Sequence, residues 1–539
     1  MQKEEKSFIM QILRRKAYWL KRQLRQIKRG IVSTYTSSAN RIAKNTLMLY
    51  FRQILIMLVN LYAVRVILET LGAVDYGIYT VVAGVVTMFT FLSGAMAHAS
   101  QRYFSFELGQ KNYEQLKKTF SVSFIIYVFL ALGMLLLAET VGLWFVHNKL
   151  VIPPERVIAA RWVYQTTVVS FVFTLLTTPY MAAIIAHEDM DIYAYVSIFE
   201  AVLKLGVVFL LVLFEVDLLI LYGFLMMIVT IINTSIYRTV CKKKYPETKV
   251  GWIWDTKLFR ELFSFTGWSI FGAFTTITRV QVITILINQF FNPIVVAARS
   301  IATQVSSALN VFASGFNTSL YAPIVKEYAA DNKEQMFSLI FNGCKMTFFL
   351  MWIFALPLLL RMEYVLAIWL KNIPDYVVVF TKLSIYEVLI NSVSLPIMTA
   401  ARASGKVKLY ELTLGSLQLL IIISSYIWIK FFQGEAVVVF YTAIIINVVM
   451  FFARLFIVQR LVGLPLRKYL YKVLAPVFII IGITSLLIGG LNNVLPQNFI
   501  SLCGVVFFSV ILSSVLMSLV GLDKNMKIKI KNKILGMLL

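Results

Sequence analysis

Hydrophobic positions fall into long runs along the whole chain, and short polar stretches separate the runs. Each run holds about 20 residues, enough for one helix to cross a hydrocarbon core of roughly 30 Å. The pattern predicts fourteen membrane-spanning helices, at 46–68, 77–101, 119–145, 157–186, 192–214, 217–239, 265–291, 294–325, 336–360, 377–401, 409–431, 436–459, 470–490 and 499–521. These helices use most of the chain and leave no room for a folded soluble domain. The predicted fold class is an all-α polytopic membrane protein.

The two halves of the chain share an order of elements. In the first half, the second apolar helix contains Ser93-Gly94, and the polar stretch after it contains Asn112-Tyr113-Glu114-Gln115. About 220 residues later the same two patterns occur again, as Ser314-Gly315 and Asn332-Lys333-Glu334-Gln335. An even number of spans in each half makes two such repeats parallel. We therefore predict two six-helix lobes followed by two C-terminal helices.

This organisation divides the chain into six parts. They are a basic amphipathic cytoplasmic tail (1–45), an N-lobe of helices 1–6 (46–240), a cytoplasmic linker (241–264), a C-lobe of helices 7–12 (265–460), helices 13–14 (461–523) and a basic cytoplasmic tail (524–539). In the first tail, apolar residues recur every three or four positions from Ile9 to Ile31, which is typical of a helix lying on anionic membrane lipids. A solvated tail that only sets the topology is the alternative.

The basic charge of the chain agrees with a membrane protein. The chain is 59% hydrophobic with a mean hydropathy of +0.80, and its net charge is +25. Most of the 51 lysines and arginines lie in the tails and in alternate loops, so the positive-inside rule places both termini in the cytoplasm. This distribution points to a membrane and not to nucleic acid. The 3 cysteines lie in an inner loop and two spans and imply no disulfide framework.

Several predicted spans contain arginines. Helix 1 carries Arg52, Asn60 and Arg65, and Arg279 lies almost at the centre of helix 7. An arginine at mid-helix costs at least about 2.5 kcal/mol in lipid, so it should face a partner or a water-filled cavity. Arg52 and Arg65 lie toward opposite ends of their span, and snorkelling to the interface is their alternative.

Helix 8 carries a polar stripe at spacings of three or four. Its members are Arg299, Thr303, Ser307, Asn310, Ser314, Asn317 and Tyr321. A lipid-facing helix does not tolerate such a stripe, because each polar group requires a partner in hydrocarbon. Contacts between helices explain part of it. Its length, together with Arg279 one helix away, favours the wall of a wet cavity, with Asn310 and Asn317 as candidate binding residues.

Acidic residues also occur within spans. Glu387 lies near the middle of helix 10 with Asn391 one turn on, and such a carboxylate is suited to carry a proton or a cation. Glu200 and Lys204, one turn apart in helix 5, are predicted to form a structural ion pair. The turn His187-Glu188-Asp189-Met190-Asp191 contains an Asp-x-Asp pattern, which is interpreted as a polar hairpin because no nucleotide-binding domain surrounds it.

Short motifs give the chain a resemblance to a known family. They are Leu71-Gly72-Ala73-Val74-Asp75-Tyr76-Gly77-Ile78-Tyr79, Ser100-Gln101-Arg102-Tyr103, Phe106-Glu107-Leu108-Gly109, Ala297-Ala298-Arg299, and Met398-Thr399-Ala400-Ala401 with Gly405-Lys406. Over helices 1 to 12 the chain resembles the Wzx-type O-antigen and capsule flippases of the multidrug/oligosaccharidyl-lipid/polysaccharide (MOP) superfamily. The resemblance implies two six-helix lobes around a central cavity lined by helices 1, 2, 7 and 8, with two further helices.

The same resemblance implies a function. Such proteins move undecaprenyl-pyrophosphate-linked oligosaccharide from the inner to the outer leaflet of the bacterial cytoplasmic (inner) membrane, and a polysaccharide polymerase and a chain-length regulator are expected partners. Guanidinium groups match phosphate oxygens, so Arg52, Arg279 and Arg299 are the expected pyrophosphate ligands. Glu387 and Asn391 are the expected ion-coupling residues.

Other functions fit the chain less well. No phosphate loop is present, so ATP is not the direct energy source, and no metal site or cofactor is expected. A proton or sodium gradient is the candidate driving force. An ion-coupled multidrug antiporter of the same superfamily is the main alternative, although its cationic substrates favour acidic cavities over arginines. A membrane-embedded polymerase would need catalytic groups on sizeable outer loops, and these loops are short.

Overall fold

The computed structural model describes residues 41–42, 44–60, 62–63, 66–67, 69–72, 75–76, 78–79, 82–86, 89–149, 152–249, 251, 253–291, 293–370 and 373–521. Within these residues the chain forms helices and no strands, which confirms the predicted fold class. The predicted amphipathic tail and Arg65 lie outside the described residues.

Ten of the described helices are long and apolar enough to cross a membrane, and eleven are if the pair α12 (Val377–Ser392) and α13 (Leu395–Ala403), bent by 40° at their junction, is one span. Helix α9 (Pro293–Ala329) is 37 residues long and carries the polar stripe, and it is not among them. The described residues of all fourteen predicted spans are nevertheless mostly helical.

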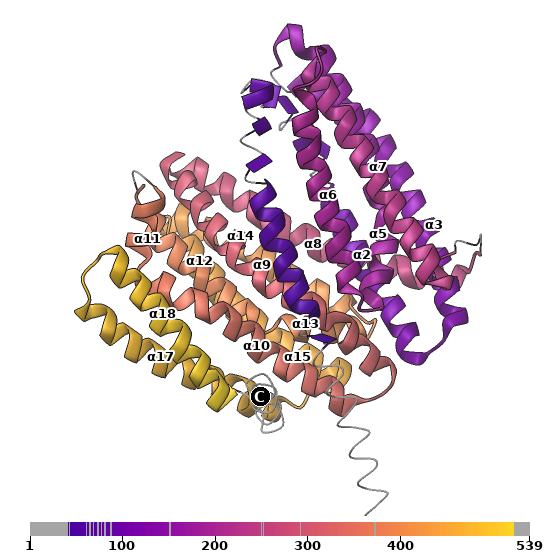
Figure 1. Ribbon diagram of the computed structural model, residues 1–539. Coiled ribbons are helices and arrows are strands. Elements are labelled where there is room, and N and C mark those ends of the chain that lie inside the picture. The colour runs from indigo at the N-terminus through magenta and orange to yellow at the C-terminus, as the bar shows by residue number, and fades with distance from the viewer. Residues whose placement is uncertain are drawn as a thin grey trace, which may run out of the picture.

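Helices from the two halves of the chain form two groups (Figure 1). The first group contains α2 (Thr90–Gln110), α3 (Tyr113–Leu137), α4 (Leu143–Lys149), α5 (Val157–Ala186), α6 (Met190–Leu211) and α7 (Leu218–Lys244). The helical residues 44–60 (helix 1) lie between this group and the second and contact both (Figure 1). The second contains α8 (Thr256–Phe290), α9, α10 (Lys333–Leu360), α11 (Met362–Trp369), α12, α13, α14 (Lys408–Phe432) and α15 (Val438–Val462). This arrangement is consistent with two lobes. The expected linker is shorter than 241–264, because α7 and α8 extend into it.

The sequence repeat corresponds to a repeated local structure. Asn112 Oδ1 accepts a hydrogen bond from the backbone N–H of Gln115 (3.1 Å) at the start of α3, and Asn332 does the same for Gln335 (3.4 Å) at the start of α10. The preceding residues, Lys111 and Asp331, both have left-handed backbones, with φ of 58° and 53°. Each Asn is therefore the N-cap of the third helix of its lobe.

The two lobes meet at the end of the molecule that carries these turns. A side chain at Gly109 would bring its Cβ within 2.7 Å of the Lys326 carbonyl oxygen, so glycine permits α2 and α9 to approach closely there. On helix 1, Thr46 Oγ1 lies 2.9 Å from Ser319 Oγ, and the Tyr50 hydroxyl donates to the carbonyl of Phe312 at 2.9 Å. This junction lies at the end with the basic loops.

Two further helices extend the second lobe. Helices α17 (Ala475–Val494) and α18 (Phe499–Leu516) follow the short α16 (Leu466–Tyr469) and lie along the outer edge of the lobe (Figure 1). Arg361, which is buried, donates hydrogen bonds to the carbonyls of Leu495 and Pro496, each at 3.1 Å. Trp352 Nε1 of α10 donates to Thr484 Oγ1 at 3.0 Å. The pair is thus fixed to α10 by buried polar contacts as well as by apolar packing.

Candidate functional site: a polar cluster in the second lobe

Two residues predicted for different roles form an ion pair. Arg279 Nη1 of α8 lies 2.7 Å from Glu387 Oε1 of α12, and the two side chains are 19% and 17% exposed. At such partial burial, each charge offsets the desolvation of the other. Glu387 has no basic residue within one turn on α12, and the structure supplies one from α8.

An asparagine that the sequence analysis did not single out completes this cluster. Asn447 Nδ2 of α15 donates to Glu387 Oε1 at 3.2 Å, and Asn391 Nδ2 donates to Asn447 Oδ1, also at 3.2 Å. Asn391 also donates to the carbonyl of Glu387 at 3.2 Å. The only sequence signal for Asn447 is an amide within a run of apolar residues, Ala443 to Phe452. Three helices therefore share one hydrogen-bonded chain of polar side chains.

Arg299 lies at the edge of this cluster. Its Nη1 donates to the carbonyl of Val280 at 3.2 Å and to the hydroxyl of Thr284, both on α8. Val280 is next in the chain to Arg279, so the Arg299 guanidinium lies beside the Arg279–Glu387 pair. The described residues place no carboxylate within ion-pair distance of Arg299. It is a half-buried cation held by neutral oxygens.

Arg52 belongs to the other lobe. Its Nη1 donates to Ser197 Oγ at 3.4 Å, and its guanidinium lies 4.5 Å from the centre of the Tyr193 ring, both on α6. Its Nε is buried without a hydrogen-bond partner. Within the described part of the chain, Arg52 also has no carboxylate at ion-pair distance. The structure thus does not join Arg52 to the Arg279 cluster by direct contact.

The polar stripe of α9 changes its surroundings along the helix. Thr303, Ser307, Asn310 and Ser314 are exposed, whereas Asn317 is half-buried and Tyr321 is buried at the lobe junction. Tyr321 donates its hydroxyl proton to the carbonyl of His98 on α2 at 3.1 Å. The lobes therefore cover the stripe at the end with the basic loops and leave it uncovered toward Arg299. Asn60 of helix 1 is exposed as well.

A second group of buried charges was not expected from the sequence. Arg402 Nη2 lies 3.7 Å from Glu411 Oε1, and Arg454 donates to the hydroxyl of Ser394. A cavity of about 360 Å³ is lined by Arg402, Glu411 and Arg454, together with His98 of α2. Two guanidinium groups face one carboxylate here, so the group carries a net positive charge at the base of the second lobe.

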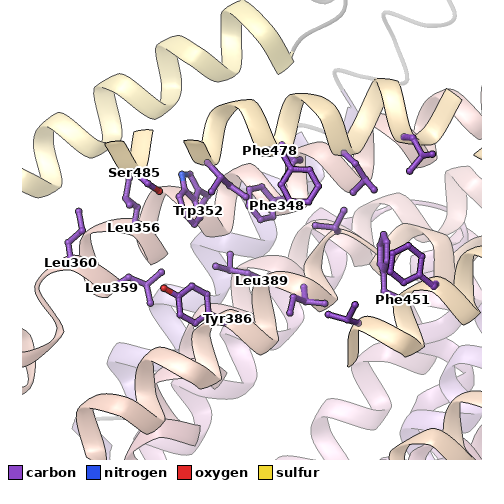
Figure 2. Close-up of a pocket in the computed structure, with 18 residues that line it drawn as sticks. Phe348, Trp352, Leu356, Leu359, Leu360, Tyr386, Leu389, Phe451, Phe478 and Ser485 are labelled. Atoms are coloured by element: carbon purple, nitrogen blue, oxygen red, sulfur yellow. The ribbon is translucent and has the colours of Figure 1, made fainter. Parts of the chain in front are cut away.

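An apolar cavity of about 680 Å³ lies on the outer side of the second lobe, where α17 packs against α10, α12 and α15. Figure 2 shows Phe348 and Trp352 of α10 beside Phe478 of α17, with Tyr386 and Leu389 of α12 on the other side. Tyr386 is next in the chain to Glu387, so one helix separates the apolar cavity from the polar cluster. The lining of the apolar cavity suits a hydrocarbon chain and not a charged group.

Comparisons with known proteins identify the fold. No family model and no curated protein sequence matches the chain. Solved structures do match: a MATE transporter in complex with MaD3S has 12% identity and a TM-score of 0.67, over 79% of this chain and 97% of its own. An outward-facing multidrug resistance MATE family transporter of the MOP superfamily has 11% identity and a TM-score of 0.68, over 79% and 96%. The MATE transporter VcmN of Vibrio cholerae has 15% identity and a TM-score of 0.61, over 81% and 98%.

These similarities define the class of fold. The chain is an all-helical multi-pass membrane protein, and its fold is similar to that of the solved MATE transporter structures. The predicted all-helical fold with two lobes is consistent with this likeness. The matched structures are almost fully covered while about a fifth of this chain has no counterpart in them.

Proposed function

We propose that this protein is a flippase, which moves undecaprenyl-pyrophosphate-linked oligosaccharide from the inner to the outer leaflet of a bacterial cytoplasmic membrane by alternating access. The observation that carries the proposal is a pair of arginines that have no carboxylate partner among the described residues, Arg52 in one lobe and Arg299 in the other. A half-buried guanidinium with unused hydrogen-bonding capacity is suited to a phosphate group, which it binds through two parallel hydrogen bonds.

The Arg279–Glu387 ion pair adds a switch to this proposal. While Glu387 holds Arg279, the ion pair carries no net charge. Protonation of Glu387, or a cation bound in place of the guanidinium, would release Arg279 to bind the cargo. Glu387 and Asn391 then act in coupling, as expected from the position of Glu387 in the middle of its span, and the driving ion is a proton or sodium. Flipped units would pass to a polysaccharide polymerase under a chain-length regulator.

The test uses a strain whose surface polysaccharide depends on this chain. Arg299→Ala should slow export by about 10-fold to 100-fold, the loss of one or two hydrogen bonds between charged groups, and lipid-linked oligosaccharide should accumulate inside. Arg299→Lys should rescue only partly, because lysine keeps the charge and loses the paired geometry. Arg161→Ala, at an exposed arginine that contacts His147, is the control. Unchanged export in Arg52→Ala/Arg299→Ala, with normal protein level, would contradict the proposal.

An ion-coupled antiporter of small cationic molecules is the second candidate. It is favoured by the matched structures, one of which is a multidrug resistance MATE family transporter. Pocket polarity is not uniform in this fold, since another matched structure, a MOP-superfamily transporter from Pyrococcus furiosus, is described by the reverse polarity of its binding pocket. Reconstituted vesicles distinguish the two candidates. A flippase should translocate a fluorescent pyrophosphate-linked lipid and should not accumulate a cationic dye against a proton or sodium gradient.

A further inference from the structure

A basic pocket lies between the lobes at the end with the basic loops, apart from the polar cluster. Its volume is about 930 Å³. One wall comes from the end of α2 (Arg102 and Tyr103), and the others come from the start of α8 and from the turn between α13 and α14. The pocket therefore exists only while the two lobes are joined as they are here.

Contacts of Arg102 hold this joint together. Its Nε and Nη2 donate to the carbonyl of Ala403 at 3.3 and 3.1 Å, and its guanidinium lies 4.4 Å from the centre of the Tyr103 ring. Gly405 has a φ of +75°, and a Cβ there would lie 2.7 Å from Arg102 Nη2. Glycine is thus required at this turn both by its backbone and by the approach of Arg102. The contacts of Arg102 with Ala403 and Gly405 thus form a fixed frame for the pocket.

Three cations on this frame are without acidic partners. Arg260, Lys406 and Lys408 are exposed in the pocket, and the described residues place no carboxylate within ion-pair distance of any of them. Glu261 is the one acidic residue of the lining, so the pocket carries a clear net positive charge. The Lys408 ammonium lies 5.3 Å from the centre of the Trp268 ring. Such a combination of cations and an aromatic ring matches an anionic group at the membrane interface.

Exposed apolar side chains adjoin the cations. Leu409 and Leu412 of α14 also line the pocket, and they are 49% and 42% exposed. A soluble phosphate ion gains no binding energy from these leucines, because it has no apolar surface. A lipid, in contrast, places its phosphate among the cations and its acyl chains along the leucines. The charge and the apolar border together therefore select an amphiphile with an anionic head.

We propose that this pocket binds the phosphate headgroup of an acidic phospholipid of the leaflet on the basic side, with its acyl chains on α14. Because the headgroup touches both lobes, it binds the joined arrangement more tightly than a separated one. By linkage, bound lipid then stabilises the joined lobes. Acidic lipid acts as a ligand that sets the balance between the two states of the carrier, whatever cargo it moves.

Native mass spectrometry of the purified full chain tests the binding. Phosphatidylglycerol should bind with one tight site, and phosphatidylcholine should not. Arg260→Ala/Lys406→Ala/Lys408→Ala should weaken the site about 100-fold, since each surface cation contributes roughly 5-fold. Lys111→Ala/Lys117→Ala/Lys118→Ala removes the same charge from an exposed region outside the pocket and should leave the affinity unchanged. If the first triple variant is not recovered folded, Lys406→Glu, at an exposed residue, serves in its place.

Three outcomes would overturn the proposal. Equal weakening by both triple variants would mean that binding depends only on the net charge of the protein. Equal binding of phosphatidylcholine would mean that the pocket does not distinguish lipid headgroups. Displacement of phosphatidylglycerol by millimolar inorganic phosphate would assign the pocket to a soluble anion. A second readout tests the linkage. Phosphatidylglycerol should slow maleimide labelling of Ser319→Cys, a buried position at the lobe junction, in the parent background and not in the pocket variant.

Discussion

Glu188 Oε1 accepts a hydrogen bond from Lys326 Nζ at 2.7 Å, which ties the turn between α5 and α6 to α9 of the opposite lobe. Its other oxygen, Oε2, lies 2.7 Å from Arg41 Nε, and Asn45 Nδ2 donates to the Glu188 carbonyl at 2.9 Å. The Glu188 side chain is 1% exposed, so both cations neutralise a buried carboxylate. One acidic residue thus connects helix 1, the first lobe and the second lobe at their junction.

Removal of this tie should loosen the junction. Lys326→Met should favour separated lobes by about 1.5–3 kcal/mol, the contribution of a hydrogen bond to a charged group. In a Cys503→Ser background, Ser319→Cys should then react with maleimide at least ten times faster than with Lys326 intact, because Ser319 is buried against Thr46 only while the lobes are joined.

Lys333→Met is the matched control for this change. Lys333 lies a few residues beyond Lys326 and contacts only the exposed Asp331, at 3.8 Å, among the described residues. Its removal should leave the labelling rate unchanged. If both variants label at the parent rate, Glu188 does not hold the lobes together.

The Arg279–Glu387 pair makes a prediction about stability. Arg279→Met and Glu387→Met should each lower the stability of the purified protein by about 2–3 kcal/mol, because each leaves one partly buried charge uncompensated. The double variant should recover most of the loss, since no charge then remains. Thermal unfolding in detergent measures the difference. Additive losses would show that the two charges do not compensate each other.

Anchoring of the C-terminal helices should depend on Arg361. Arg361→Ala removes the donors to the Leu495 and Pro496 carbonyls and leaves these oxygens without their partner. We expect the melting temperature to fall by several degrees and limited proteolysis to begin between α17 and α18. Arg361→Lys should retain part of the effect. Equal protease resistance in wild type and Arg361→Ala would contradict this role.

One pair outside the spans predicts a pH dependence. Burial raises the pKa of Glu247, but the hydrogen bond from His187 (2.6 Å) and the Glu247 backbone N–H lower it further, so the pKa lies below its ordinary value. A lowered carboxyl pKa stabilises the fold above the unfolded-state pKa of about 4.3, and this contribution disappears as the pH falls through the folded-state value. His187→Ala should therefore lower the melting temperature by a few degrees at pH 7 and by less below about pH 4.3. A pH-independent difference would exclude this pair as its source.

Hydropathy alone predicted the helical fold, because the bilayer demands long apolar helices whatever their packing. Local polar pairs were also predictable. Glu200 and Lys204, one turn apart, form the expected ion pair at 2.6 Å, and Asn233 of α7 adds a hydrogen bond to Glu200 at 2.8 Å. The capping asparagines Asn112 and Asn332 follow from short sequence patterns as well.

Contacts between distant helices were not predictable in this way. Arg279 and Glu387 are 108 positions apart, and helical periodicity tells which face a residue occupies but not which helix that face meets. Glu188 was missed for a related reason. Its turn was interpreted as a polar hairpin from its composition, whereas its importance comes from Lys326 and Arg41, which only the tertiary fold brings together.

The attachment of α17 and α18 to the second lobe alone makes the two halves of the molecule unequal in size (Figure 1). A body with a longer perimeter meets more viscous drag when it turns within a fluid bilayer. If the two lobes rock against each other, equal and opposite torques should therefore turn the second lobe through a smaller angle than the first, relative to the surrounding lipids. The rotation of the two lobes would then be asymmetric, with the larger share in the first lobe.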